Sequence, residues 1–271
     1  NPHTKPLPFW EWLIADIQSR HDDVLFLSEA FTRPAMMQRL AKIGFSQSYT
    51  YFTWRETKAE LTAYLEELTQ PPLCDYFRPH FFVNTPDILP RYLQTSGRAG
   101  FVIRAALAAT LSGLWGLYSG FELAEAAALP GREEYLDSEK YQLRPRDWSA
   151  PGNLIAEITR LNQLRRRYRA LQTTAGLRFQ HCDNAQVLCY RKRDDAELLL
   201  IAVSLDPHHA QETWLDVPLD DLGASGDEEI DVEELISMQA LRWRGPRQHW
   251  RFVPQEMPFA IWRLQRRVSS S

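Results

Sequence analysis

Two runs of mostly apolar residues each lead to a single carboxylate. Residues 25–28 read Leu-Phe-Leu-Ser and precede Glu29, and residues 81–86 lead to Asp87. Such a run is typical of a buried parallel strand. In a barrel of alternating strands and helices, the reacting groups lie at the carboxyl ends of the strands. Two carboxylates brought to one barrel mouth by two strands suit glycosyl transfer.

Each acid has an ordinary explanation when it is taken alone. A Glu after a strand is most often an exposed strand-end residue, and Asp87 beside Pro86 is a common turn residue. A retaining mechanism also requires a nucleophilic carboxylate, and the sequence offers no third acid in a comparable position. The two acids therefore indicate a glycosyl-transfer site only through their joint occurrence and order.

Strands and helices alternate over the first 170 residues. Apolar patterns predict strands over 24–27, 45–52, 80–83 and 114–118, with helices that include 56–68 and 97–111. Such alternation with short connections is typical of a parallel α/β architecture. A closed barrel of this kind has eight strands. The pattern therefore predicts half of a (β/α)8 barrel.

A long polar segment over 129–152 follows the last of these predicted strands. It has few periodic apolar positions and too many aromatic residues for a linker, and long loops in this place are usually functional. A helix is predicted next, over 154–168.

The periodicity changes from residue 176 onward. Six short strands are predicted over 177–180, 187–190, 198–203, 213–217, 249–253 and 259–264, several of which alternate apolar and polar residues. This spacing favours an antiparallel β-sandwich. We therefore predict two domains, 1–170 and 171–271. The acidic stretch 220–234 has no calcium-loop pattern and is interpreted as a solvated loop.

Charge and composition exclude several function classes. The net charge of −4 argues against nucleic acid or an anionic membrane as the main partner. No apolar stretch reaches the length of about 18 residues that a membrane helix needs. Cys74, Cys182 and Cys189 have no metal-like spacing, and their odd number fits reduced thiols and a cytoplasmic protein.

Four strings in the first 150 residues match a known family. They are NPHTKPLPFW at 1–10, FLSEAFTRP at 26–34, FVNTPDIL at 82–89 and YLDSEKY at 135–141. With them the chain resembles the retaining glycoside enzymes of the α-amylase superfamily. Within that superfamily it is similar to the bacterial maltosyltransferases that lengthen α-1,4-glucans from maltose 1-phosphate. The last string is distinctive, because ordinary amylases lack it.

The resemblance implies a role for each matching residue. Glu29 would be the general acid/base and Asp87 the acid that stabilises the transition state. Asn1, Lys140 and Tyr141 would bind the phosphorylated donor. His3, Lys5 and Asn84 share the motifs without a role that the residues themselves explain. The resemblance also implies a homodimer and a mechanism that needs no metal and no cofactor.

The chain departs from the family pattern at its first residue. In the family the nucleophile is an Asp directly before the Asn-Pro-His string, and here that string starts at Asn1. The resemblance therefore implies the C-terminal portion of a larger enzyme, inactive and unable to fold alone, whose partner is the missing N-terminal part of the same protein.

Two alternatives remain open from the sequence. The chain could belong to an amylase-like hydrolase or isomerising glucosidase of the same superfamily. It could instead be a non-catalytic glucan-binding module that uses Trp214, Trp243, Trp250 and Trp262. A lysine at 140, where a phosphate would bind, favours the transferase.

Overall fold

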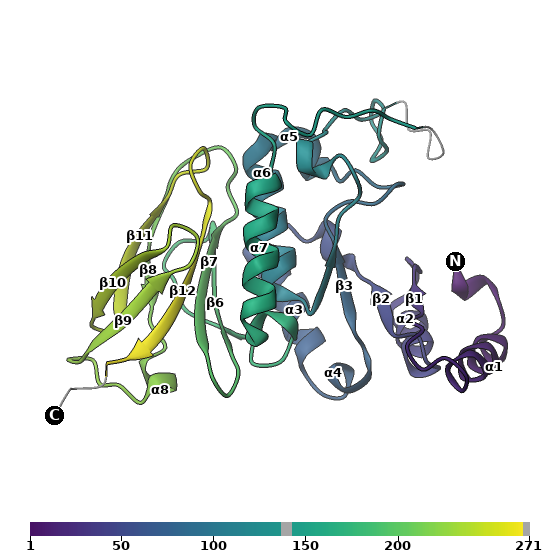
Figure 1. Cartoon of the computed structure of the whole chain (residues 1–271), viewed down its shortest axis with the longest axis horizontal. Coiled ribbons are helices and arrows are strands. Elements are labelled where there is room, and N and C mark those ends of the chain that lie inside the picture. The colour runs from purple at the N-terminus through teal and green to yellow at the C-terminus, as the bar shows by residue number, and fades with distance from the viewer. Residues whose placement is uncertain (137–142, 268–271) are drawn as a thin grey trace.

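The computed structural model describes residues 1–136 and 143–267, which form a parallel α/β layer followed by antiparallel sheets (Figure 1). Within these residues the parallel sheet has four strands in the order β1-β2-β3-β4, so that neighbours in sequence are neighbours in space. Sequential parallel strands joined by helices are the arrangement of half a (β/α)8 barrel, which confirms the predicted fold class. The strands are β1 (Leu27–Ser28), β2 (Gln47–Tyr49), β3 (Pro79–Phe82) and β4 (Leu114–Gly116).

Helices connect these strands and pack against them. The N-terminus of α3 has a capping box, in which the Thr57 side chain accepts the Glu60 N–H and Glu60 accepts the Thr57 N–H. The α-helices are α1 (Leu7–Gln18), α2 (Pro34–Lys42), α3 (Lys58–Thr69), α4 (Leu73–Tyr76), α5 (Arg91–Thr95), α6 (Gly97–Leu111) and α7 (Ile155–Arg167). The 3-10 helices are η1 (Pro2–Thr4), η2 (Tyr51–Trp54), η3 (Phe121–Leu123) and η4 (Arg169–Gln172).

The strands of the parallel sheet are shorter than their apolar runs. The run over 45–52 yields only β2, because the Thr50 hydroxyl accepts the Phe52 N–H and starts η2. An apolar run indicates which residues are buried and not which residues pair in a sheet. It therefore predicts the presence of a strand better than it predicts where the strand begins and ends.

Two antiparallel sheets make up the rest of the described chain. The larger has the order β10-β9-β12-β7-β6-β5, and the smaller pairs β11 with β8. A second hydrophobic cluster, which includes Val187, Leu215 and Trp262, fills the space between them. The bounds are β5 (Arg178–Phe179), β6 (Val187–Arg193), β7 (Leu198–Ser204), β8 (Gln211–Asp216), β9 (Glu229–Glu234), β10 (Gln239–Arg244), β11 (Arg247–Phe252) and β12 (Phe259–Arg266).

The acidic stretch 220–234 is not the solvated loop that we predicted. It contains the end of the short helix α8 (Leu219–Leu222) and the whole of β9. Ile230, Val232 and Glu234 are buried, whereas Glu229 and Asp231 are exposed. This alternation was present in the sequence, but the density of acidic residues hid it.

Helices α6 and α7 lie between the parallel sheet and the antiparallel sheets (Figure 1). One hydrophobic cluster includes Leu107 of α6, Leu164 of α7 and Ile201 of β7, so the core crosses from one part to the other. The domain boundary between 170 and 171 therefore stays a prediction.

Two cations lie close to each other, Arg165 of α7, which is partly buried, and Lys192 of β6. Arg165 donates to the carbonyl oxygens of Ser112 at 2.9 Å and Leu171 at 2.7 Å. Lys192 is fully buried and donates to the Thr173 carbonyl. Burial, followed by the positive charge of Arg165, lowers the pKa of Lys192 to about 7. We call this pair of side chains, Arg165 and Lys192, the cationic junction.

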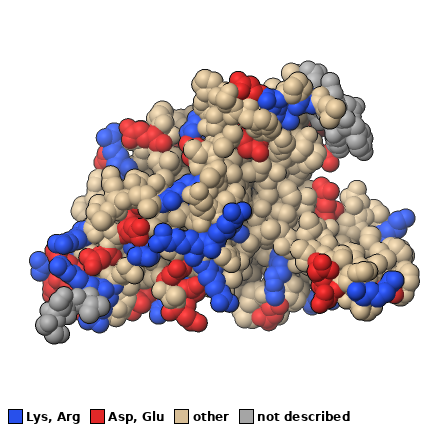
Figure 2. All heavy atoms as spheres, viewed as in Figure 1, with Lys and Arg blue, Asp and Glu red and all other residues tan. Residues whose placement is uncertain are grey.

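The described helices include none that is both long and apolar enough to cross a bilayer. On the face drawn in Figure 2, acidic and basic side chains alternate over the antiparallel sheets. The ion pairs of the antiparallel sheets include Arg191–Asp221 and Arg266–Glu228.

Candidate active site at the carboxyl edge of the parallel sheet

Glu29 directly follows β1 at the carboxyl edge of the sheet, and its side chain is exposed. It lies close to Tyr49, the last residue of the neighbouring strand β2. Burial, and then the negative charge of Glu29, raise the pKa of the Tyr49 hydroxyl to about 12. The hydroxyl therefore stays protonated at neutral pH and can donate a hydrogen bond beside Glu29.

Aromatic rings fix the loop that follows Glu29. The Phe31 ring packs edge-on against Tyr49, with 5.7 Å between centroids, and against Trp54, with 5.3 Å. The Tyr51 hydroxyl donates to the Thr32 carbonyl at 2.8 Å. Aromatic pairs in this edge-on geometry are stabilising, and they give the surroundings of Glu29 an apolar side.

Asp87 lies at the tip of a tight turn beyond β3. Two backbone hydrogen bonds between Thr85 and Ile88, of 3.0 and 3.2 Å, close the turn. The Asp87 N–H donates to the Thr85 hydroxyl at 3.2 Å, and the Asp87 side chain is exposed. A closed turn restricts the backbone, so it presents this carboxylate in a defined direction.

Asn84, three residues before Asp87, is completely buried and holds the turn from below. Its amide accepts the Tyr118 N–H at 2.7 Å and donates to the Tyr118 carbonyl at 3.2 Å. The same amide nitrogen contacts the Tyr135 hydroxyl at 2.5 Å. Asn84 thus joins β3 to the segments that follow β4, which gives this motif residue a positioning role that the sequence did not explain.

The sheet order brings the two acids to one edge. Strands β1 and β3 flank β2, and all three run parallel. Adjacent strands are about 5 Å apart, so the backbones that lead to Glu29 and Asp87 are about 10 Å apart. Side chains that reach inward from this separation can approach opposite sides of one sugar ring.

The strand register places Tyr49, His80 and Phe82 on the sheet face below this edge. Tyr49 is opposite His80, and the Phe82 ring centroid is 4.0 Å from that of His80. Burial lowers the pKa of His80 to about 4, so the ring is neutral. Neither ring nitrogen has a hydrogen-bond partner among the described residues. Neither His80 nor Tyr49 is among the residues predicted from the sequence to form the site, although their positions on the predicted strands could have indicated them.

Of the three residues predicted to bind the donor, the described residues include only Asn1. Asn1 is exposed and accepts the Thr4 N–H and hydroxyl, at 3.1 and 2.8 Å. η1 then packs against α2, the helix that follows the Glu29 loop. His3 is half-buried and Lys5 exposed.

Lys140 and Tyr141 lie outside the described residues, as does much of the string that contains them. The segment that leads to them is fixed near Asp87. The Glu133 carboxylate accepts the Trp54 indole N–H at 2.9 Å and the Arg91 N–H at 3.0 Å. The Leu89 N–H also donates to the Glu133 carbonyl at 2.9 Å.

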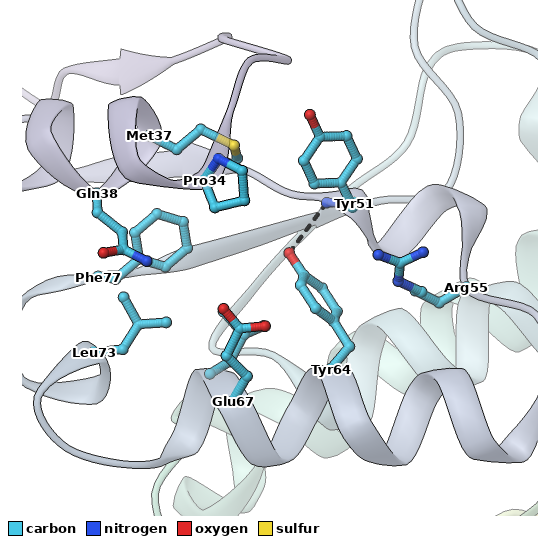
Figure 3. Close-up of a pocket in the computed structure, with 10 residues that line it drawn as sticks. Pro34, Met37, Gln38, Tyr51, Arg55, Tyr64, Glu67, Leu73 and Phe77 are labelled. Atoms are coloured by element: carbon cyan, nitrogen blue, oxygen red, sulfur yellow. Dashed lines mark hydrogen bonds between the residues drawn. The ribbon is translucent and has the colours of Figure 1, made fainter.

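A separate pocket lies between α2, η2, α3 and α4 (Figure 3). In it the Tyr64 hydroxyl accepts the Tyr51 N–H at 3.1 Å, and burial raises the pKa of Tyr64 to about 12. The Tyr51 hydroxyl also donates to the Thr32 carbonyl in the loop after Glu29. Tyr51 therefore connects α3, through Tyr64, to the carboxyl edge of the parallel sheet.

The described residues contain no group of three or more His, Cys, Asp or Glu side chains that could hold a metal ion.

Comparison with known proteins gives both sequence relatives and structural neighbours. Residues 179–264 match a family model described as "GLGE, C-terminal". The chain is 60% identical to the alpha-1,4-glucan:maltose-1-phosphate maltosyltransferase of Pseudomonas aeruginosa, over 98% of this chain and 40% of that protein. It is 57% identical to the enzyme of the same name from Burkholderia pseudomallei, over 97% of this chain and 24% of that protein. The chain thus spans less than half of the curated relatives that it matches.

Solved structures share the fold at low identity. The α-amylase of Geobacillus thermoleovorans, complexed with acarbose, superposes with a TM-score of 0.73 at 14% identity, over 97% of this chain and 58% of that one. A gamma-CGTase from an alkalophilic Bacillus clarkii gives a TM-score of 0.66 at 16% identity, over 98% of this chain and 39% of that one.

Proposed function

Because the chain is homologous over nearly its whole length to part of the alpha-1,4-glucan:maltose-1-phosphate maltosyltransferases, we propose that it supplies the acid/base half of such an enzyme. The single observation that supports this most directly is the placement of Glu29 and Asp87 at one carboxyl edge of the parallel sheet. The reaction is retaining transfer of a maltosyl unit from maltose 1-phosphate to the non-reducing end of an α-1,4-glucan, with release of phosphate.

In the first step, a carboxylate attacks the anomeric carbon and the bond from that carbon to the phosphate oxygen breaks. We propose that the rest of a longer polypeptide provides that carboxylate, because the chain spans only 40% of the length of its Pseudomonas aeruginosa relative. The Asp87 carboxylate stabilises the positive charge that develops at the anomeric carbon. Phosphate is a good leaving group, so proton donation by Glu29 matters less here than in an amylase.

In the second step, Glu29 acts as a base. It removes the proton from the terminal 4-hydroxyl of the glucan, whose oxygen then attacks the anomeric carbon and releases the enzyme carboxylate. The apolar side of the Glu29 loop, formed by Phe31 and Trp54, favours the glucan over water as acceptor.

Donor recognition falls to Asn1, Lys140 and Tyr141. A phosphate dianion needs a cation and hydrogen-bond donors, and these residue types supply them. The fixed contacts of Glu133 support this assignment, because they hold the chain before residue 137 close to the Asp87 turn.

We further propose that the longer enzyme is a cytoplasmic homodimer in glycogen or α-glucan synthesis, and that this chain alone is inactive.

The test measures phosphate release from maltose 1-phosphate by the longer enzyme, with maltohexaose as acceptor. We expect acceptor-dependent release that falls by about 100- to 10,000-fold in Glu29→Gln, the range for loss of a general base. Glu11→Gln, an exposed acid on α1, is the matched control and should behave as wild type.

The other outcomes separate the alternatives. Reducing sugar liberated from starch without phosphate release would indicate an amylase-like hydrolase and refute the phosphate donor. Full activity of Glu29→Gln would refute the acid/base assignment.

A further inference from the structure

The side chain of Lys58, the first residue of α3, reaches from the parallel α/β layer to the antiparallel sheets. Its nitrogen donates to the carbonyl oxygens of Cys182 at 3.3 Å and Asn184 at 3.1 Å. The same nitrogen lies 3.1 Å from the sulfur of Cys182. A lysine nitrogen usually ends in solvent, whereas this one ends at a cysteine that is only 6% exposed.

Hydrogen bonds hold the loop that carries Cys182 in one position. The Asn184 side chain donates to the Gln211 side-chain oxygen and to the Glu212 carbonyl, both at 3.0 Å, which ties the loop to β8. The Cys182 thiol donates to the Val187 carbonyl at 3.1 Å. The sulfur therefore has a defined place next to the amine, and their contact does not depend on a loose surface side chain.

The three cysteines have different surroundings. Cys189 is buried, and this burial raises the pKa of its thiol well above the ordinary value, so the thiol stays protonated and unreactive. Cys74 is half-buried, and its sulfur contacts a carboxylate oxygen at 3.5 Å. Cys182 lies just below the surface, between the exposed residues His181 and Asp183. Its sulfur is therefore within reach of a small oxidant and is already in contact with an amine.

From this geometry we propose that Lys58 and Cys182 form a covalent sulfur–nitrogen bond when the enzyme is exposed to hydrogen peroxide. In the first step the Cys182 sulfur attacks a peroxide oxygen and the oxygen–oxygen bond breaks, which gives a sulfenic acid and water. The sulfur loses two electrons and the peroxide gains them. In the second step the Lys58 amine, after it has lost a proton to solvent, attacks the sulfur. The sulfur–oxygen bond breaks, and the hydroxyl leaves as water with a proton from the amine.

The resulting sulfenamide joins α3 to the segment between β5 and β6, and thus the parallel α/β layer to the antiparallel sheets. A cross-link between residues so far apart in sequence restricts the unfolded chain. Oxidation to this level is reversible, because a thiol reductant cleaves the sulfur–nitrogen bond and restores the thiol and the amine. The reaction uses no sugar substrate, so the link should form whether or not the enzyme transfers maltosyl units.

The test is peptide mapping by mass spectrometry of the longer enzyme after treatment with hydrogen peroxide and digestion without reductant. We expect a fragment that joins the peptides of Lys58 and Cys182 and is lighter than their sum by two hydrogen atoms. Dithiothreitol should split this fragment into the two unmodified peptides. Cys74→Ser, which removes the half-buried thiol of α4, is the matched control and should form the link as wild type does.

Two further variants distinguish the link from a disulfide. Lys58→Arg keeps the positive charge, but a guanidinium stays protonated and does not attack sulfur, so the linked fragment should disappear. Cys189→Ser removes the thiol that interacts with Cys182 and should leave the fragment in place. A disulfide between Cys182 and Cys189 in the wild type would overturn the proposal. So would a linked fragment that survives in Lys58→Arg or carries an extra oxygen atom, or a Cys182 that is unmodified or oxidised without any link.

Discussion

At the scale of single residues, the candidate site depends on a buried amide as much as on its two acids. Asn84 uses both ends of its side chain to join β3 to Tyr118 and Tyr135, and it contacts no solvent. The Asp87 turn begins at the next residue. The loss of a hydrogen-bond partner lowers the free energy of unfolding more for a buried donor or acceptor than for one at the surface, because water cannot replace the partner.

We therefore expect Asn84→Ala to lower the free energy of unfolding by about 3 kcal/mol, because two backbone groups of Tyr118 and one hydroxyl lose their partner. Tyr135→Phe removes only the hydroxyl and should cost about 1 kcal/mol. Urea denaturation of the longer enzyme measures both values. Equal stability of wild type and Asn84→Ala would contradict this positioning role.

At the scale of elements, the cationic junction between α7 and β6 couples stability to pH. Folding lowers the pKa of Lys192 to about 7, whereas in the unfolded chain a lysine titrates at about 10.4. Between these values the unfolded state binds more protons, so the free energy of unfolding rises with pH. Below pH 7 both states are protonated and the cost of burying the charge is fully present.

We expect the free energy of unfolding to increase from pH 6.5 to pH 9 by an amount on the order of a few kcal/mol. The midpoint of thermal unfolding should rise with it over the same pH range. Lys192→Met removes the buried charge and should flatten this dependence while it stabilises the protein at pH 6.5. Lys5→Met, which changes an exposed lysine, should leave the pH profile as in wild type. A profile of Lys192→Met that still rises would show that another group is responsible.

The helices and strands predicted from the sequence include both the best and the poorest agreement with the structure. The helix over 97–111 was predicted at its observed bounds, because a continuous Ala- and Leu-rich segment has few alternatives. β9 and β10 were missed, since buried residues such as Ile230 alternate there with acids. Glu29 and Asp87 could be found because they end apolar runs. The positioning role of Asn84 could not, because it arises from contacts with Tyr118 and Tyr135, which are distant in sequence.

At the scale of the whole molecule, the parallel sheet has two open edges in the described residues, at β1 and at β4. Near the first edge Leu25 is 68% and Leu27 is 49% exposed. Unpaired strand edges beside apolar side chains pair readily with other chains.

Expressed alone, the 271-residue chain should therefore elute from size-exclusion chromatography mainly as large aggregates. Replacement of both leucines, as Leu25→Lys with Leu27→Lys, should reduce the aggregated fraction, because charge at an edge opposes pairing. Co-expression with the remainder of the longer enzyme should give a single discrete species. A monodisperse monomer of the unmodified chain that unfolds cooperatively would show that the open edges are harmless.

The position of β12 bears on how the ribosome delivers this protein. β12 lies between β7 and β9 in the six-stranded sheet, although it follows both of them, and every other described strand, in sequence. Until residue 266 has left the exit tunnel, β7 and β9 lack the strand that pairs with both of them, and the edges that pair with β12 stay unpaired. The earlier strands must therefore remain unaggregated until β12 has been synthesised, and during this interval the nascent chain is exposed to misfolding that a chaperone can prevent.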